Sequence, residues 1–94
     1  MNSMDENQME QWQSFVNAFR LQKSGTDPWN ADQLEASCRG ASHGELCTIR
    51  FLLAVWDPGK EWTCGKFDAI DAASVWDDHH RHEFAKWVRE PWWP

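Results

Sequence analysis

Leucine, isoleucine, valine and phenylalanine are scarce in this chain of 94 residues. Together they occupy 16 positions, and tyrosine is absent. So small an apolar set, with a net charge of −6, is typical of disordered chains. Eight tryptophans reverse that expectation, because each indole can remove about 150–250 Å² from water. The sequence therefore predicts a folded domain whose core is built largely from aromatic rings.

Basic residues are also few, and the sequence gathers them into no basic tail. Nine Lys and Arg residues stand against fifteen Asp and Glu residues, and residues 1–40 and 41–94 each carry a charge of −3. An evenly acidic domain repels a phosphate backbone. We therefore expect no general nucleic-acid binding and predict that the partner is another protein.

Long apolar runs are missing as well. A membrane-spanning helix needs roughly 18 apolar residues, and no segment approaches that length. The first twenty residues contain three acidic side chains and no apolar stretch of the secretory type. The sequence thus predicts a cytoplasmic protein that does not bind membranes. Its three cysteines are then expected to be reduced thiols.

The length suits a single domain. We expect residues 1–4 to be a disordered N-terminus and residues 5–94 to form one helical domain. Apolar spacing predicts helices over 5–23, 31–39, 43–56, 69–75 and 79–90. Residues suited to cap them are Asn30, Ser42, Asp68 and either Asp77 or Asp78. The predicted fold class is mainly α, a small bundle of four to five short helices around a Trp-rich core.

Two details of this helical pattern stand out. Asn30 with Gln33 and Ser42 with Glu45 have the spacing of a capping box. Residues 61–67 have no helical period, so this segment is expected to be either a packed loop or one short extended strand.

The eight tryptophans fall into two groups by position. Those on or at the ends of apolar helix faces are predicted core residues: Trp12, Trp56, Trp76 and Trp87. Those in loops or at the chain end are Trp29, Trp62, Trp92 and Trp93. For this second group, a lid folded over the core competes with an exposed binding patch, since tryptophan is enriched at interaction hot spots. These four are the predicted partner-binding residues.

Cysteine and histidine residues offer one candidate metal site. If a metal binds, its predicted ligands are Cys38, His43, Cys47 and Cys64. Structural zinc takes four nitrogen or sulfur ligands, and His43 and Cys47 lie one helical turn apart. The sequence has no Cys-x-x-Cys motif, and buried cysteines also serve as small apolar residues. The favoured expectation is therefore no metal and no cofactor.

A second cluster of histidines occurs near the start of the last predicted helix. His79, His80 and His82 lie beside the acidic residues Asp77 and Asp78. His79 and His82 are three residues apart, a spacing that suits metal chelation or a pH-sensitive patch. A solvated polar first turn, capped by aspartate, is the favoured interpretation.

Few residues of the sequence are suited to catalysis. His43 and Cys47 are the one pair suited to nucleophilic chemistry, but the sequence identifies no third orienting group and no phosphate-binding glycine loop. A DNA-binding helix-turn-helix over residues 31–56 would carry only Arg50 as a base on its second helix. We therefore predict neither catalytic residues nor DNA recognition.

These features favour a small non-enzymatic protein-interaction module, an adaptor or an inhibitor. In general character, though in no residue pattern, the chain resembles short acidic proteins encoded by bacterial phages and plasmids. The alternatives are a zinc-stabilised module and a small enzyme or enzyme subunit that uses Cys47 and His43. Self-association through exposed tryptophans is equally compatible with the sequence.

Overall fold

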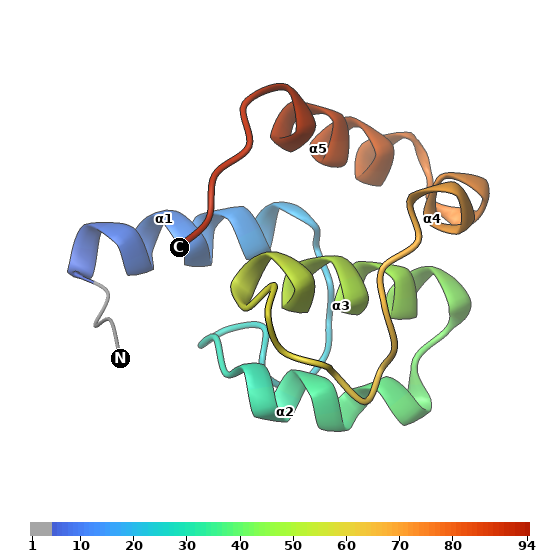
Figure 1. The fold of residues 1–94 in the computed structure, drawn as a ribbon, viewed down its shortest axis with the longest axis horizontal. Helices are drawn as coiled ribbons and strands as arrows, with labels where there is room; N and C mark the ends of the chain where they lie inside the picture. Colours follow the sequence, from blue (N-terminus) through green and yellow to red (C-terminus); the bar gives the residue numbers. More distant parts are fainter. Residues whose placement is uncertain (1–4) are drawn as a thin grey trace.

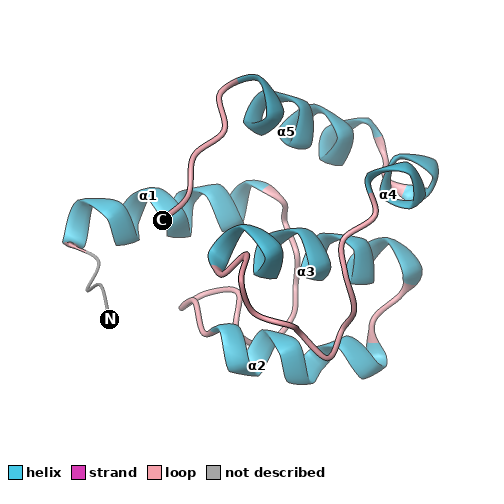
Figure 2. Cartoon of the chain, viewed as in Figure 1, coloured by secondary structure: helices cyan, strands magenta, loops and turns pink. Residues whose placement is uncertain are grey.

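A computed structural model describes residues 5–94; residues 1–4, the predicted disordered N-terminus, lie outside the described part. The described chain forms five helices connected by loops (Figure 1). They are α1 (Glu6–Ala18), α2 (Ala31–Ala36), α3 (His43–Trp56), α4 (Ala69–Val75) and α5 (Asp78–Arg89). A 3₁₀ turn, Ser37–Gly40, follows α2 directly. Residues 5–94 contain no strand, and 61–67 form a loop, so the mainly α prediction is confirmed (Figure 2).

Helix α3 occupies the centre of the bundle, with α2 below it and α5 above it in Figure 1. Seven of its fourteen residues are buried, as expected for the most apolar segment of the chain. The ring of Phe51, in α3, contacts both neighbouring helices. On one side it meets Phe15 of α1 and Phe19, the C-cap of α1. It also meets Phe84 and Trp87 of α5. A helix that is apolar on most sides is stable only when other elements surround it.

Aromatic rings supply much of the core, as predicted. Trp12 is fully buried, and Trp76 is 5% exposed. The Trp76 indole N–H donates to the Thr48 hydroxyl at 2.9 Å, so this buried polar pair is satisfied. Trp56 and Trp87 are partly buried and pack against the same core. All four tryptophans predicted for the core therefore contact it.

Helix α1 ends five residues earlier than the predicted end at Lys23. Phe19 is its C-cap, and Arg20 adopts a positive φ of 54°, which takes the chain out of the helix. Because the helix ends at Ala18, Phe19 and Leu21 can both be buried. Tertiary burial of two apolar side chains has overridden a local helical pattern that continues past the break.

Helix caps explain most of the remaining boundaries. At Ser42 the predicted capping box is complete: Ser42 Oγ accepts from the Glu45 amide at 3.2 Å, and Glu45 Oε1 accepts from the Ser42 amide at 2.9 Å. At Asn30 only half of the box forms. Asn30 Oδ1 accepts from the Gln33 amide, whereas the Gln33 side chain accepts from Ser24 Oγ at 3.4 Å.

Removal of the Ser42 hydroxyl tests the cap of the central helix. We expect Ser42→Ala to lower the free energy of unfolding by about 1 kcal/mol, because the Glu45 amide loses its acceptor. Urea denaturation followed by circular dichroism measures this change. Ser14→Ala, an exposed serine within α1, is the matched control and should change stability by less than about 0.5 kcal/mol. Equal losses in the two variants would contradict the capping role.

Candidate functional site

A cavity of about 720 Å³ lies between α3 and the loop that follows it. Arg50 and Ala54 line it from α3, and residues 58–62 and 65–67 supply the rest of its wall. We call it the Trp62 pocket. Its charged and aromatic lining residues are Arg50, Lys60, Glu61, Trp62, Lys66 and Phe67. Three of the nine basic residues of an acidic chain thus line one cavity.

Hydrogen bonds to two helices hold the wall of the Trp62 pocket in place. Glu35 of α2 accepts from both the amide and the hydroxyl of Thr63, at 2.7 and 3.0 Å. These bonds also hold the pKa of the Glu35 carboxyl below its usual range. Arg50 Nε donates to the Cys64 carbonyl at 2.7 Å. The loop is therefore anchored to α2 through Thr63 and to α3 through Cys64.

The charge inside the Trp62 pocket is opposite to that of the whole chain. Lys60 Nζ lies 4.1 Å from the centroid of the Trp62 ring, a cation–π contact, and 3.9 Å from an Asp32 carboxylate that is 87% exposed. Within residues 5–94, Lys66 makes no ion pair. A concave wall with an excess of one charge concentrates ions of the opposite charge, and here three basic residues face one acid, Glu61. The pocket is suited to an anionic group accompanied by an apolar one.

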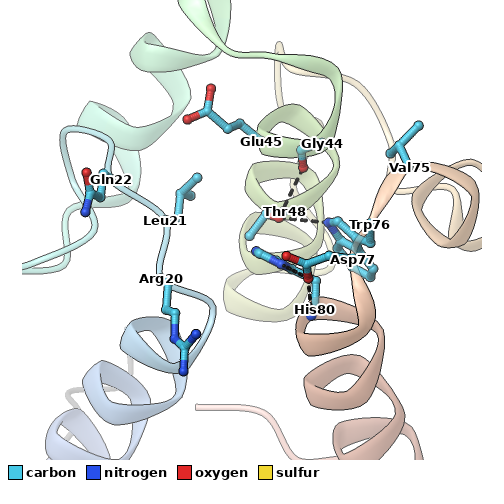
Figure 3. Close-up of a pocket in the computed structure, with 10 residues that line it drawn as sticks. All are labelled: Arg20, Leu21, Gln22, Gly44, Glu45, Thr48, Val75, Trp76, Asp77 and His80. Carbon is cyan, nitrogen blue, oxygen red and sulfur yellow. Dashed lines mark hydrogen bonds and ion pairs between the residues drawn. The ribbon is translucent and has the colours of Figure 1, made fainter.

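A second cavity, of about 370 Å³, lies where the end of α1, the start of α3 and the α4–α5 junction meet (Figure 3). Several of its polar side chains are engaged within the protein, whereas Arg20 and Gln22 make no side-chain hydrogen bond or ion pair among residues 5–94. His80 Nδ1 lies 2.7 Å from an Asp77 oxygen that also caps α5, and Thr48 bonds the Trp76 indole. Glu45, on the opposite wall, completes the cap of α3. With Arg20 as its one Lys or Arg residue and with Glu45 and Asp77 as acids, this cavity lacks the excess of basic residues that lines the Trp62 pocket.

Two of the predicted partner-binding tryptophans lie over the core as a lid. The Trp29 ring is edge-on to Trp12, with centroids 5.1 Å apart, and contacts Trp56 at 5.2 Å. The C-terminal segment turns back toward α1 in Figure 1, and Trp92 contacts Trp12 at 6.1 Å. The Trp92 carbonyl accepts from the Trp87 indole at 2.9 Å. Both rings are partly buried against the core.

The other two predicted partner-binding tryptophans differ from each other in exposure. Trp93 is 54% exposed and touches Trp87 edge-on at 5.3 Å. Trp62 is partly buried, with one side in the pocket that bears its name. Its indole nitrogen is buried and has no hydrogen-bond partner among residues 5–94, so the accessible part of the ring is apolar. A partner-binding role for all four rings stays a prediction.

A cluster of potential metal ligands joins α3 to α4. His43 begins α3, Cys47 follows one turn later, and Asp71 lies in the first turn of α4. His43 Nε2 lies 2.8 Å from Asp71 Oδ2, and the Cys47 thiol donates to the same oxygen at 3.5 Å. The three donor atoms all lie within 4.8 Å of one another. We call this group the His43–Cys47–Asp71 cluster.

The cluster differs from the predicted set of metal ligands. His43 and Cys47 meet as expected, but Cys38 and Cys64 are not part of the group. Asp71 was missed because it is 24 residues from Cys47 and belongs to a different helix. The available signal was its position three residues after the Asp68 cap, which only marks a helix start.

The chemistry of Cys47 follows from its surroundings. Burial, followed by the Asp71 carboxylate, raises the pKa of the Cys47 thiol to about 11. The hydrogen bond from His43 holds the pKa of Asp71 below its usual range. Because His43 and Cys47 both face the carboxylate, the imidazole is not positioned as the base of the thiol. A thiol with a raised pKa is a weak nucleophile at neutral pH, so this geometry does not favour nucleophilic chemistry.

Cys64 is buried among apolar neighbours. Burial, followed by contact with Cys38, raises the pKa of its thiol to about 12. Its sulfur donates to the Glu35 carbonyl at 3.5 Å, beside the loop anchor described above. Cys64 therefore packs as a small apolar side chain and supports one wall of the Trp62 pocket.

The histidines of α5 have separate local roles. His79 Nε2 lies 2.6 Å from the Ala18 carbonyl, which links α5 to the end of α1. His80 pairs with Asp77 in the first turn, and these bonds hold the pKa of the exposed Asp77 carboxyl below its usual range. His82 is exposed. The aspartate cap agrees with the favoured interpretation, but the turn is not fully solvated: His79 and His80 are partly buried, and the His80 ring stacks on Trp76.

No protein-family model, curated protein or solved structure matches this chain. Across residues 5–94, the helices are all too short or too polar to cross a bilayer. Function must therefore be inferred from the chemistry of the surface itself.

Proposed function

We propose that this chain is a small non-enzymatic protein-interaction module that docks an acidic segment of a partner protein in the Trp62 pocket. The observation that carries the proposal is the local reversal of charge. Arg50, Lys60 and Lys66 line one cavity of a chain whose net charge is −6. Among the described residues that line this cavity, Glu61 is the only acid.

The walls of the pocket combine two kinds of contact. Trp62 and Phe67 supply aromatic surface, and the lysines supply positive charge beside it. Buried aromatic anchors contribute much of the affinity at protein interfaces, whereas charges mainly set specificity and association rate. A peptide with alternating acidic and apolar side chains matches both features. The volume falls within the roughly 300–1,000 Å³ of typical binding pockets.

The anchored loop supports the same conclusion. Glu35 and Arg50 already hold the backbone of Thr63 and Cys64, so little conformational entropy is lost when a ligand binds. Such a preformed pocket on a small chain suits an adaptor that presents one partner to another, or an inhibitor that occupies a surface of a larger protein.

Selection of peptides against the intact chain tests the proposal without an identified partner. A random peptide library displayed on phage is panned on the immobilised protein. The expected result is enrichment of peptides with an excess of Asp and Glu near an apolar residue. For a synthesised selected peptide, Lys60→Glu with Lys66→Glu should weaken binding roughly tenfold or more, measured by fluorescence anisotropy.

The matched control changes the same charge elsewhere on the surface. Lys86→Glu with Arg89→Glu alters two exposed bases of α5 and should leave the affinity for the selected peptide nearly unchanged. Enrichment without acidic bias, or equal weakening by both double variants, would contradict docking in the Trp62 pocket. Light scattering of the chain without peptide distinguishes peptide docking from self-association. Self-association would make the protein dimeric at micromolar concentration.

A further inference from the structure

The His43–Cys47–Asp71 cluster brings together three different donor types from two helices. His43 and Cys47 share one face of α3 because they are four residues apart, and α4 packs against that face with Asp71 in its first turn. An imidazole nitrogen, a thiol and a carboxylate oxygen therefore converge on one point.

The donor atoms are close to the spacing of zinc ligands, and small shifts of the exposed His43 side chain would complete it: the three atoms lie within 4.8 Å of one another. Zinc bonds of about 2.0–2.3 Å place tetrahedral ligands roughly 3.3–3.8 Å apart. The sulfur of Cys47 is already 3.5 Å from Asp71 Oδ2. His43 Nε2 is at 2.8 Å and would have to withdraw by roughly half an ångström or more. The His43 side chain is 56% exposed, so it has the freedom to make that shift.

We propose that His43, Cys47 and Asp71 bind a divalent transition-metal ion, preferentially zinc, across the contact between α3 and α4. The mixed nitrogen, sulfur and oxygen donors fall among the ligands that zinc accepts. The exposed side of the cluster leaves a fourth position open to solvent or to a side chain of a partner. Buried Cys47 anchors the ion, and the half-exposed His43 provides the entry side.

Charge balance supports this assignment. Zinc displaces one proton from the Cys47 thiol, forming a zinc–sulfur bond, and the proton passes to solvent. The divalent ion then faces one thiolate, one carboxylate and a neutral imidazole, so the first coordination shell is electrically neutral. The carboxylate of Asp71, which now accepts hydrogen bonds from both other groups, exchanges them for a single metal bond.

Cobalt(II) reports on this site directly, because a cobalt–thiolate bond gives a charge-transfer band in the near ultraviolet. Titration of the reduced, chelator-treated full chain should develop this band with 1:1 stoichiometry, and zinc should abolish it by competition. Cys47→Ser should remove the band. His43→Gln, at a position whose side chain is half-exposed, and Asp71→Asn should each weaken zinc binding about tenfold or more.

Two variants outside the cluster serve as controls, with circular dichroism confirming that each is folded. His82→Gln removes an exposed histidine of α5, and Cys64→Ser removes a different buried thiol. Both should keep the band and the zinc affinity of the unmodified chain. The proposal is overturned if no 1:1 binding occurs, if the band survives Cys47→Ser, or if His82→Gln weakens zinc binding as much as His43→Gln does.

Discussion

Gly25→Ala is expected to destabilise the protein by at least about 4 kcal/mol, a large share of the roughly 5–14 kcal/mol that stabilises a domain of this size. Gly25 has a φ of +94°, which L residues rarely adopt. A Cβ there would lie 2.5 Å from both the Asn30 carbonyl oxygen and the Leu34 amide nitrogen. Both are backbone atoms at the start of α2, so neither can move aside as a flexible side chain would. Thermal and urea unfolding by circular dichroism measure the loss.

Gly65→Ala distinguishes the strain of a positive φ from the clash of a Cβ with the backbone of α2. Gly65 has nearly the same φ, +91°, but a Cβ there would meet only the flexible Arg50 side chain, at 3.4 Å. Backbone strain alone should then lower stability by about 1–2 kcal/mol. A loss in Gly65→Ala as large as that in Gly25→Ala would show that backbone conformation, and not the approach of α2, dominates at both sites.

Trp12→Ala should lower the free energy of unfolding by about 3–5 kcal/mol and the melting temperature by roughly 15 °C or more. Trp12 is fully buried, and its ring contacts Phe15, Trp29, Trp56 and Trp92. Truncation leaves a cavity that elements from four parts of the chain would have to fill. Calorimetry measures the change in melting temperature.

Trp93→Ala is the control for the loss of an indole ring. Trp93 is 54% exposed and makes one edge-on ring contact, with Trp87. Its removal should change stability by less than about 1 kcal/mol. If the two variants lost similar stability, the central role of Trp12 in the aromatic core would be wrong.

Local signals predicted the helices well where capping chemistry and apolar spacing agreed. Helix α3 begins after Ser42 and ends at Trp56 as expected, because its capping box and its apolar residues mark the same boundaries. The first helix was predicted too long, since nothing local shows that Phe19 and Leu21 must both reach the core. That boundary depends on burial, a property of the assembled chain.

In the candidate sites, too, some residues could be predicted from local spacing and others could not. His43 and Cys47 are neighbours on one helix, and their pairing could be predicted from spacing alone. Asp71 joins them only because α4 packs on α3, and its carboxylate resembles many others in an acidic sequence. The Trp62 pocket was also beyond prediction, since Arg50 and Lys66 approach each other through a loop without periodicity.

The sequence by itself determined that this chain folds, that it folds as helices, and that indole rings form much of its interior. These properties depend on composition, on periodicity and on caps formed within four residues. Only the tertiary structure decided which tryptophans cover the core, which bases surround a cavity and which carboxylate meets His43 and Cys47. Those outcomes depend on contacts between residues far apart in the chain, whose energies are settled when the helices pack together.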